Sequence, residues 1–165
     1  MAIFKPSEII DKFNKLDINK YKELGFKLVL IDIDNTITIP NTGLFTDEAK
    51  QFVENIKLAG LTPVIFSNNT KNRVSRFVDG YDVKWSYWSF KPLPFAYWNQ
   101  CFKNHCKPSE TLVIGDQIMT DILGANISGC YGIYSKQLQE KDTILTSINR
   151  VIEKFIWKYI IHEKM

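Results

Sequence analysis

Short apolar runs alternate along the chain with segments in which apolar residues recur at the spacing of a helix. The runs that predict strands are residues 28–34, 62–67, 83–88, 111–115 and 130–134. The first, second and fourth runs are apolar almost throughout, which is typical of strands covered on both faces of a parallel sheet. The segments that predict helices are residues 46–59, 71–78, 93–105 and 119–127. This alternation predicts an α/β fold with a doubly wound, Rossmann-like parallel sheet of about five strands.

The helix expected at residues 46–59 has the clearest boundaries. Thr46 is suited to cap its amino terminus, and Asp47 and Glu48 place negative charge in the first turn, where the helix dipole favours it. Gly60 follows the helix and suits the left-handed turn that ends many helices. We therefore expect this helix to begin and end close to these positions.

The composition is that of an ordinary globular protein, with 165 residues of which 45% are hydrophobic and 24% charged. This length fits one domain, residues 1–165, which can bury a continuous core without disulfides or a structural metal. No run approaches the ~18 consecutive apolar residues of a membrane-spanning helix. The net charge of +3 is too small to indicate nucleic acid, so no specific nucleic-acid binding is expected.

The cysteine content bears on the cellular compartment. Cys101, Cys106 and Cys130 give an odd count, and no apolar signal run precedes the first structured segment. Both features predict a cytoplasmic protein with reduced thiols. Cys101, His105 and Cys106 lie close together in the sequence, but their spacing lacks a second pair of ligands and matches no zinc pattern. We therefore interpret them as packing or surface residues.

Polar and charged residues follow the predicted strands at the positions where each strand ends. They are Asp32 and Asp34 after the first strand, Ser67 and Asn68 after the second, Lys91 after the third and Asp116 after the fourth. In open parallel sheets, ligands bind beyond the carboxyl ends of the strands, so these side chains are expected to meet. Asp and Asn also occur at strand ends as ordinary turn residues. Three acids, a lysine and a hydroxyl at one edge favour a chemical site instead.

The chemistry that these groups support is phosphoryl transfer. Asp32 and Asp34 are two apart on an extended segment and face a common space, and Asp116 and Asp121 add carboxylates at the same edge. Their mutual repulsion raises pKa values or requires a cation, and hard oxygen ligands suit Mg²⁺. The lysine and the serine named above add a fixed positive charge and a hydroxyl donor. In phosphoryl-transfer sites, positioning and charge neutralisation carry most of the catalysis.

Four segments of the sequence, taken in order, resemble the motifs of the haloacid dehalogenase (HAD) superfamily of aspartate-nucleophile phosphatases. They are DIDNT (32–36), FSNN (66–69), KP (91–92) and GDQIMTDILGAN (115–126). GDQ, TD and GAN within the last motif, followed by DTILTSINRVIE (142–153), resemble the YqeG-like branch of subclass IIIA. The likeness covers nearly the whole chain, and four motifs in the right order are far more specific than the first motif alone.

The resemblance implies a role for each residue of the site. Asp32 would attack phosphorus and form an aspartyl-phosphate, and Asp34 would act as general acid and then general base. Thr36 would steady the loop of Asp34, and Lys91 would offset the charge of Asp32. The implied catalytic residues are Asp32, Asp34, Thr36 and Lys91, the implied phosphate-binding residues Ser67, Asn68 and Lys91, and the implied Mg²⁺ ligands Asp32, Asp34 through its main-chain carbonyl, Asp116 and, near or through water, Asp121.

Members of this superfamily commonly insert a cap domain that shields the site and selects small substrates. Here the interval from Asp34 to Ser67 is taken up by a short loop, one helix and one strand, and the interval from Ser67 to Lys91 by a helix and a strand. Neither interval leaves room for a cap. We therefore expect an open site that suits a large phosphorylated substrate, such as a phosphoprotein, a nucleic-acid end or a lipid headgroup, unless a second subunit closes it.

Aromatic residues surround the predicted lysine. Residues 85–98 contain seven aromatic side chains, most of which core packing explains, while some are expected to overhang the site and favour a substrate with an apolar part.

The helix expected at residues 146–164 docks one apolar face on the sheet and presents cations with apolar residues interleaved on the other. The residues of that second face are Arg150, Lys154, Trp157, Lys158 and Ile161. Such a face is either merely solvated or meets a protein or the inner face of a membrane. Relatives in this subclass include enzymes that dephosphorylate phosphatidylglycerophosphate, which makes a lipid phosphate our hypothesis for the substrate.

Two other functions compete with the phosphatase. A receiver domain of a signalling relay also places acids, Thr and Lys around Mg²⁺, but its acidic pair precedes a lone phosphoacceptor on a later strand. An assembly or scaffolding factor that binds a protein or a ribosomal particle, with phosphatase activity secondary, agrees equally with a basic aromatic helix. Phosphoryl transfer to Asp116 would favour the first alternative, and a stable stoichiometric partner would favour the second.

Overall fold

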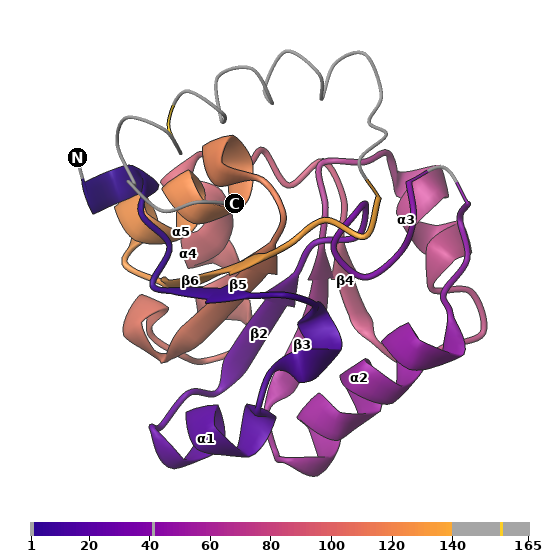
Figure 1. The fold of residues 1–165 in the computed structure, drawn as a ribbon, viewed down its shortest axis with the longest axis horizontal. Helices are drawn as coiled ribbons and strands as arrows, with labels where there is room; N and C mark the ends of the chain where they lie inside the picture. Colours follow the sequence, from indigo (N-terminus) through magenta and orange to yellow (C-terminus); the bar gives the residue numbers. More distant parts are fainter. Residues whose placement is uncertain (1, 41, 140–155, 157–165) are drawn as a thin grey trace.

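The computed structural model describes residues 2–40, 42–139 and 156. Its centre is a six-stranded sheet in the order β1-β6-β5-β2-β3-β4, in which all neighbouring strands run parallel (Figure 1). The strands are β1 (Glu8–Ile10), β2 (Leu28–Ile31), β3 (Thr62–Phe66), β4 (Lys84–Ser86), β5 (Thr111–Gly115) and β6 (Tyr131–Ser135). The α/β class and the parallel sheet that the sequence predicts are therefore confirmed.

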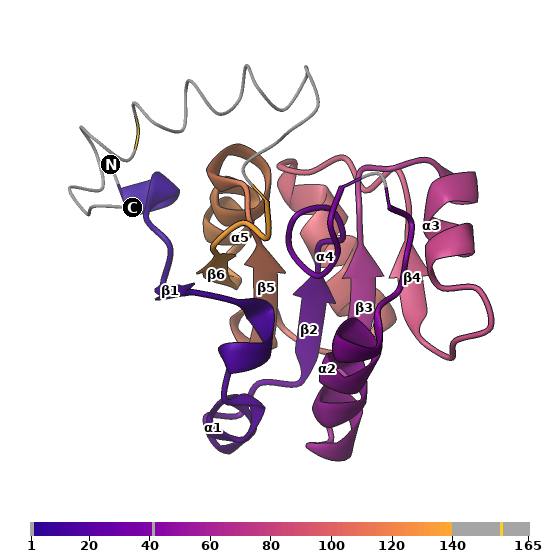
Figure 2. The same ribbon diagram turned by 45° about the vertical axis from the view of Figure 1, so that its right-hand side comes forward.

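Helices cover both faces of this sheet. Figure 2 shows α1 and α2 in front of it and α4 behind it, with α3 beside the edge strand β4. The α-helices are α1 (Ile18–Glu23), α2 (Asp47–Leu58), α3 (Lys71–Phe77), α4 (Pro94–Lys103) and α5 (Leu123–Ser128). Shorter turns are the 3₁₀ segments η1 (Ala2–Phe4), η2 (Phe13–Lys15) and η3 (Pro108–Glu110), and the π-helix η4 (Ile118–Ile122). The intervals that the sequence assigns to loop, helix and strand hold those elements and no cap across residues 2–40 and 42–139.

The central strand β2 explains why its sequence is apolar at every position. Val29 and Ile31 pack in the core cluster on the side of α1 and α2, whereas Leu28 and Leu30 pack in the cluster that contains residues of α4. Successive side chains of a strand point to opposite faces, so a strand covered on both sides needs an apolar residue at each position. All four side chains are fully buried.

The predicted boundaries of α2 agree with the structure. The Thr46 hydroxyl accepts a hydrogen bond from the backbone N–H of Ala49 at 3.2 Å, which satisfies one of the free donors at the amino terminus of the helix. Gly60 follows with a φ of +79°, a left-handed conformation that glycine adopts without steric cost. Thr70 caps α3 in the same way as Thr46 caps α2.

Several elements differ from the sequence-based expectation. The helix α1 was not expected, and the strand expected at residues 28–34 ends at Ile31. The edge strand β1 was not expected, because three residues are too short to show a periodic pattern. The strand expected at residues 83–88 ends at Ser86, because the chain turns through left-handed conformations at Trp88 and Phe90. The helix expected at residues 119–127 consists of a π-helix followed by α5.

The helix expected at residues 146–164 lies outside the described residues apart from Ile156. This residue is helical and buried, in a cluster with Ile118, Ile122 and Tyr134. None of the helices in the described ranges combines the length and the apolar character needed to cross a bilayer.

The close approach of α4 and α5 depends on the absence of a side chain at Gly124. A Cβ at this position would lie 2.2 Å from the hydroxyl of Tyr97, which is fully buried and donates a hydrogen bond to the backbone carbonyl of Thr120. Gly124→Ala is therefore expected to lower the free energy of unfolding by about 2–3 kcal/mol, because the buried ring has no space into which it can move. Urea unfolding followed by circular dichroism measures this loss.

Gly132→Ala is the matched control, because a Cβ there would meet the Ala125 methyl at 3.2 Å, which a small shift of the backbone can relieve. Its loss is expected to stay under about 1.5 kcal/mol. A Gly124→Ala protein as stable as the Gly132→Ala protein would contradict the packing of α4 on α5 described above.

Candidate active site

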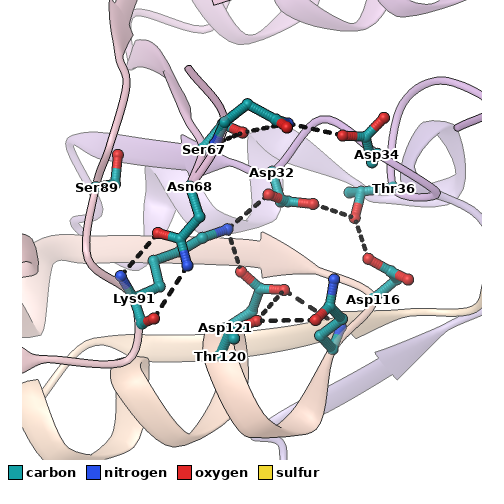
Figure 3. Close-up of polar contacts among 12 residues, drawn as sticks. Asp32, Asp34, Thr36, Ser67, Asn68, Ser89, Lys91, Asp116, Thr120 and Asp121 are labelled. Carbon is teal, nitrogen blue, oxygen red and sulfur yellow. Dashed lines mark hydrogen bonds and ion pairs between the residues drawn. The ribbon is translucent and has the colours of Figure 1, made fainter. Parts of the chain in front are cut away.

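The loops that follow β2, β3 and β5 bring the predicted site residues to one edge of the sheet. Ile31 of β2 pairs with Ile65 of β3 and Ile114 of β5, so the three strands end at the same level. In Figure 2 their arrows point in one direction, toward the loops at the top. The eight residues that the sequence predicts for the site lie around this edge (Figure 3): Asp32, Asp34, Thr36, Ser67, Asn68, Lys91, Asp116 and Asp121.

Lys91 joins two of the acids through buried ion pairs. Its ammonium lies 2.6 Å from a carboxylate oxygen of Asp32 and 2.6 Å from one of Asp121. The side chains of all three residues are at most 9% exposed. Water screens such an arrangement poorly, so its charges interact far more strongly than they would on the surface. The position of the lysine therefore determines where both carboxylates lie.

Burial and charge shift the pKa values of these groups. Removal from water raises the pKa of Asp32 to about 7, against the opposing effect of Lys91 and with a further contribution from Asp121. Burial alone would lower the pKa of Lys91, but the carboxylates of Asp121 and Asp32 outweigh it and raise that pKa above its usual value. Lys91 is therefore cationic at any physiological pH, and the charge of Asp32 is sensitive to further cations.

Asp32, Asp116 and Asp121 form a buried acidic triad. Each offers a carboxylate oxygen within 4.8 Å of the others, and no other set of three or more His, Cys, Asp or Glu side chains among residues 2–40 and 42–139 has this geometry. With the ammonium of Lys91, three ionised carboxylates leave a formal charge of −2 inside the protein. Buried charge of this size requires compensation. The carboxylate oxygens are suitable ligands for Mg²⁺, and its two positive charges would balance the formal charge of −2.

Thr36 and Gln137 hold Asp116 in the triad. The Thr36 hydroxyl donates to one carboxylate oxygen of Asp116 at 3.1 Å, and the Gln137 amide donates to the other at 3.2 Å. Thr36 and Asp116 are fully buried. The role that the resemblance implies for Thr36, steadying the loop of Asp34, is compatible with this bond but is not tested by it.

Gly115 and the π-helix η4 explain how Asp121 reaches Lys91. A Cβ at Gly115 would lie 2.2 Å from Cγ of Asp121, so only glycine leaves space for this carboxylate. The backbone N–H of Gln117 donates to the second carboxylate oxygen of Asp121 at 3.2 Å. π-helical turns are rare and occur frequently at functional sites, where the extra residue changes the direction of a side chain. The sequence GDQIMTD thus encodes both the acid and the space that it occupies.

Asp34 lies on the loop after β2, where it has different partners from Asp32. The side-chain amide of Asn69 donates to one carboxylate oxygen at 2.7 Å, and the guanidinium of Arg73 contacts the other at 2.5 Å. The Asp34 side chain is 24% exposed, so solvent reaches it. A carboxylate beside the buried Asp32 and open to water is suited to exchange protons with a substrate.

Ser67 and Asn68 stand at the end of β3. The Ser67 hydroxyl accepts hydrogen bonds from the backbone N–H of Asn69 at 3.2 Å and from its side-chain amide at 2.9 Å. Asn68 accepts a hydrogen bond from the backbone N–H of Lys91 at 2.9 Å and donates to its carbonyl at 3.0 Å. Asn68 therefore positions the lysine, and a direct contact of either residue with a phosphate stays a prediction.

Sequence reasoning missed three residues that hold the site together. Asn69 and Arg73 bind Asp34, and Gln137 binds Asp116. Asn69 lies within the FSNN motif and Arg73 in the first turn of the next predicted helix, so their proximity to the strand end was a usable signal. Gln137 follows β6, and nothing in its neighbours distinguishes it from an ordinary loop residue.

The three cysteines lie on the α4 side of the sheet. Cys101 and Cys130 are buried and belong to the core cluster on that side, and Cys106 packs against this cluster. The Cys101 sulfur lies 3.3 Å from the Thr111 hydroxyl. This placement agrees with the interpretation of Cys101 and Cys106 as packing residues.

Two family models match the chain. Residues 1–77 match the mitochondrial PGP phosphatase family, and residues 90–145 match the HAD-hydrolase-like family. The first range contains Asp32, Asp34 and Ser67, and the second contains Lys91 and Asp116. The two matches thus divide the site between them along the sequence.

Two relatives resemble the chain over most of its length. The chain is 30% identical to the probable phosphatase YqeG of Bacillus subtilis, over 93% of this chain and 89% of that protein. It is 27% identical to the mitochondrial phosphatidylglycerophosphatase GEP4 of Saccharomyces cerevisiae, over 81% and 78% of the two chains.

A structure of 3-deoxy-D-manno-octulosonate 8-phosphate phosphatase from Moraxella catarrhalis, in complex with a magnesium ion, a phosphate ion and KDO, superposes with a TM-score of 0.52. It is 15% identical, over 84% of this chain and 91% of that one, and so shares the fold. The identity to YqeG over almost the full length, together with the HAD-hydrolase-like match, establishes the relationship. The chain therefore belongs to the HAD superfamily, in the family of the probable phosphatase YqeG.

Proposed function

We propose that the protein is a Mg²⁺-dependent phosphomonoester hydrolase that acts through an aspartyl-phosphate on Asp32. The observation that carries this proposal is the contact of Lys91 with both Asp32 and Asp121 inside the acidic triad. An acid next to a buried ammonium and two further carboxylates has the surroundings of a nucleophile for an anionic substrate. The family relationship to probable phosphatases supports the same reaction.

Asp32 performs the first step, in which one of its oxygens bonds to phosphorus and the bond from phosphorus to the substrate oxygen breaks. Asp34 in its protonated form gives its proton to that leaving oxygen, so an alcohol departs. Lys91 and the hydroxyl of Ser67 balance and hold the charge of the phosphoryl group. Asp32, Asp116, the carbonyl of Asp34 and, near or through water, Asp121 would hold Mg²⁺, which would supply further charge neutralisation.

Asp34 then acts as a base in the second step. Its carboxylate removes a proton from a water molecule, which attacks phosphorus, and the bond from Asp32 to phosphorus breaks to release inorganic phosphate. Asn69 and Arg73 hold the Asp34 carboxylate through both steps. The two acids thus differ in role because one is buried beside Lys91 and the other is open to water.

The substrate that we propose is a phospholipid headgroup with a terminal phosphate, such as phosphatidylglycerophosphate. The match of residues 1–77 to a PGP phosphatase family and the similarity to GEP4 support this substrate. The absence of a cap across residues 2–40 and 42–139 agrees with a substrate too large to be enclosed. The proposed place of action is the cytoplasm, at the inner face of a membrane.

Asp32→Asn is expected to reduce the hydrolysis of phosphomonoesters at least about a thousandfold, because the amide cannot form the covalent intermediate. A panel of phosphomonoesters, assayed by phosphate release with Mg²⁺ present or chelated, measures this effect. Asp47→Asn is the control, because Asp47 is a fully exposed acid at the start of α2. Turnover that survives in Asp32→Asn would contradict the assigned nucleophile. A stable stoichiometric partner whose binding survives in Asp32→Asn would favour the assembly factor instead.

The buried Asp32 also predicts how stability depends on pH. Its pKa is raised from an ordinary value of 3.8 to about 7, so its contribution to the unfolding free energy is fully present below pH 3.8 and is lost as the pH rises through 7. In metal-free buffer, the wild type is therefore expected to lose stability relative to Asp32→Asn between about pH 4 and pH 8. Urea unfolding at several pH values measures the difference.

Mg²⁺ provides the second arm of this experiment, because a bound cation favours the ionised carboxylates. At about pH 8, Mg²⁺ should stabilise the wild type and Asp47→Asn, but stabilise Asp116→Asn much less. A wild type that gains stability relative to Asp32→Asn as the pH rises, or equal Mg²⁺ stabilisation in Asp116→Asn, would contradict the assigned site.

The proposed substrate predicts a preference for lipid. Phosphatidylglycerophosphate in mixed micelles is expected to have a kcat/KM at least about tenfold above that of glycerol 3-phosphate, because the lipid adds binding outside the reacting group. Phosphate release under matched Mg²⁺ measures both values. An equal or lower kcat/KM for the lipid would contradict the proposed substrate but not the hydrolase mechanism.

A further inference from the structure

The chain between Tyr87 and Phe102 presents an unusual amount of apolar surface to solvent. Of the 13 large hydrophobic side chains that are exposed among the described residues, seven lie in this segment. They are Tyr87, Trp88, Phe90, Leu93, Phe95, Trp98 and Phe102, which we call the aromatic surface. Scattered single hydrophobic residues need no explanation, but a contiguous group marks a binding surface.

On α4, the aromatic residues occupy the face that points away from the core. The buried residues of this helix are Ala96, Tyr97, Gln100 and Cys101. Phe95 and Phe102 are two turns apart on the opposite face and are 54% and 82% exposed. An ordinary surface helix carries polar residues on that face. Core packing explains Tyr97, as the sequence predicts for most of these aromatics, but it does not explain Phe95 or Phe102.

The aromatic surface begins beside the active site. The backbone N–H of Trp88 donates to the carbonyl of Asn69 at 2.9 Å, and that of Ser89 donates to the carbonyl of Ser67 at 3.1 Å. Phe90 directly precedes Lys91 and is 60% exposed. The loop that presents these aromatic side chains is thus bonded to the loop that carries Ser67. A partner that binds this end of the aromatic surface therefore lies next to the loop that carries Ser67.

The charged side chains of the segment that carries the aromatic surface are all positive. Residues 83–107 contain no Asp or Glu, although the chain has 18 acidic residues. Lys84 and Lys103 line a pocket of about 770 Å³ between β4 and α4, which also has no acidic residue in its lining. The ammonium of Lys71, on α3, lies 5.9 Å from the ring centre of Tyr87. This surface therefore combines exposed aromatic rings with cations.

We propose that the aromatic surface docks on the interface of a membrane that contains anionic phospholipids, with Phe95 and Phe102 inserted among the headgroups. Trp, Tyr and Phe partition into this interface, and lysines beside them are attracted by the negative surface potential. The complementary charge favours lipid over a second copy of the chain, whose identical surface would bring lysines together. This inference rests on the proposed function, because docking would present lipid phosphates to the adjacent site.

The test is co-sedimentation of the full chain with vesicles of phosphatidylcholine, with and without phosphatidylglycerol. The double variant Phe95→Ser/Phe102→Ser is expected to lower the partition onto phosphatidylglycerol vesicles at least about tenfold, because two apolar side chains no longer enter the interface. Binding of the wild type should weaken with added salt and without phosphatidylglycerol.

The matched control is Leu24→Ser/Leu58→Ser, which removes two similarly exposed apolar residues at the ends of α1 and α2. Its partition onto the vesicles should stay within about twofold of the wild type. Both double variants should hydrolyse a water-soluble phosphomonoester at the wild-type rate, which separates docking from folding and catalysis.

Vesicle binding that is absent in the wild type, or unchanged in Phe95→Ser/Phe102→Ser, would overturn the docking proposal. A dimer seen by sedimentation velocity, lost in this variant and without vesicle binding, would assign the surface to a second copy instead. Hydrolysis of the soluble ester without vesicle binding would leave the proposed function intact. Vesicle binding without hydrolysis of any ester would support the docking proposal and contradict the proposed hydrolase activity.

Discussion

The buried contact of Lys91 with Asp32 and Asp121 is the constraint on which the site depends. Three segments far apart in the sequence must meet for it to form, and its ion pairs measure 2.6 Å. Breaking a buried pair by removing one partner typically costs about 3–5 kcal/mol, because a charge is left without compensation. Features of the fold that otherwise look unrelated serve this contact. Asn68 clamps the lysine backbone, and Gly115 leaves space for the Asp121 carboxylate.

The site could be predicted from the sequence because its residues follow apolar strands of a parallel sheet. Asp32, Ser67 and Asp116 each stand one position beyond a strand, where the fold itself brings them together. Lys91 was harder to place from geometry alone, because a loop with two left-handed residues separates it from β4. The strand expected at residues 83–88 placed it at the same edge, and the order of the four motifs agreed with that assignment.

What the sequence did not predict depends on contacts between distant segments. Gln137 carries no local signal of a site, and only the fold shows that Arg73 binds Asp34 and that Gln137 binds Asp116. The π-helix at Ile118–Ile122 has the apolar spacing of an ordinary helix, so its different hydrogen bonding was not visible. Likewise, periodicity shows that α4 is amphipathic. It does not show that the aromatic residues Phe95 and Phe102 on its outward face are exposed to solvent.

The aromatic surface and the acidic triad have opposite chemistry but share one loop. Residues 87–91 run from exposed rings to a buried ammonium within five positions. A phospholipid has the same order of properties, since an apolar body leads through a headgroup to a phosphate. This correspondence is the physical link between the proposed reaction and the proposed docking surface.

The proposed reaction requires that Asp32 become phosphorylated during turnover. Rapid quenching of the enzyme with substrate and Mg²⁺, reduction with borohydride and peptide mass spectrometry locate an acyl phosphate, because reduction converts the modified aspartate to homoserine. A phosphorylated Asp32 would give homoserine at position 32, in an amount that depends on Mg²⁺ and on substrate. Homoserine at position 116, or none at either position while phosphate is released, would contradict it.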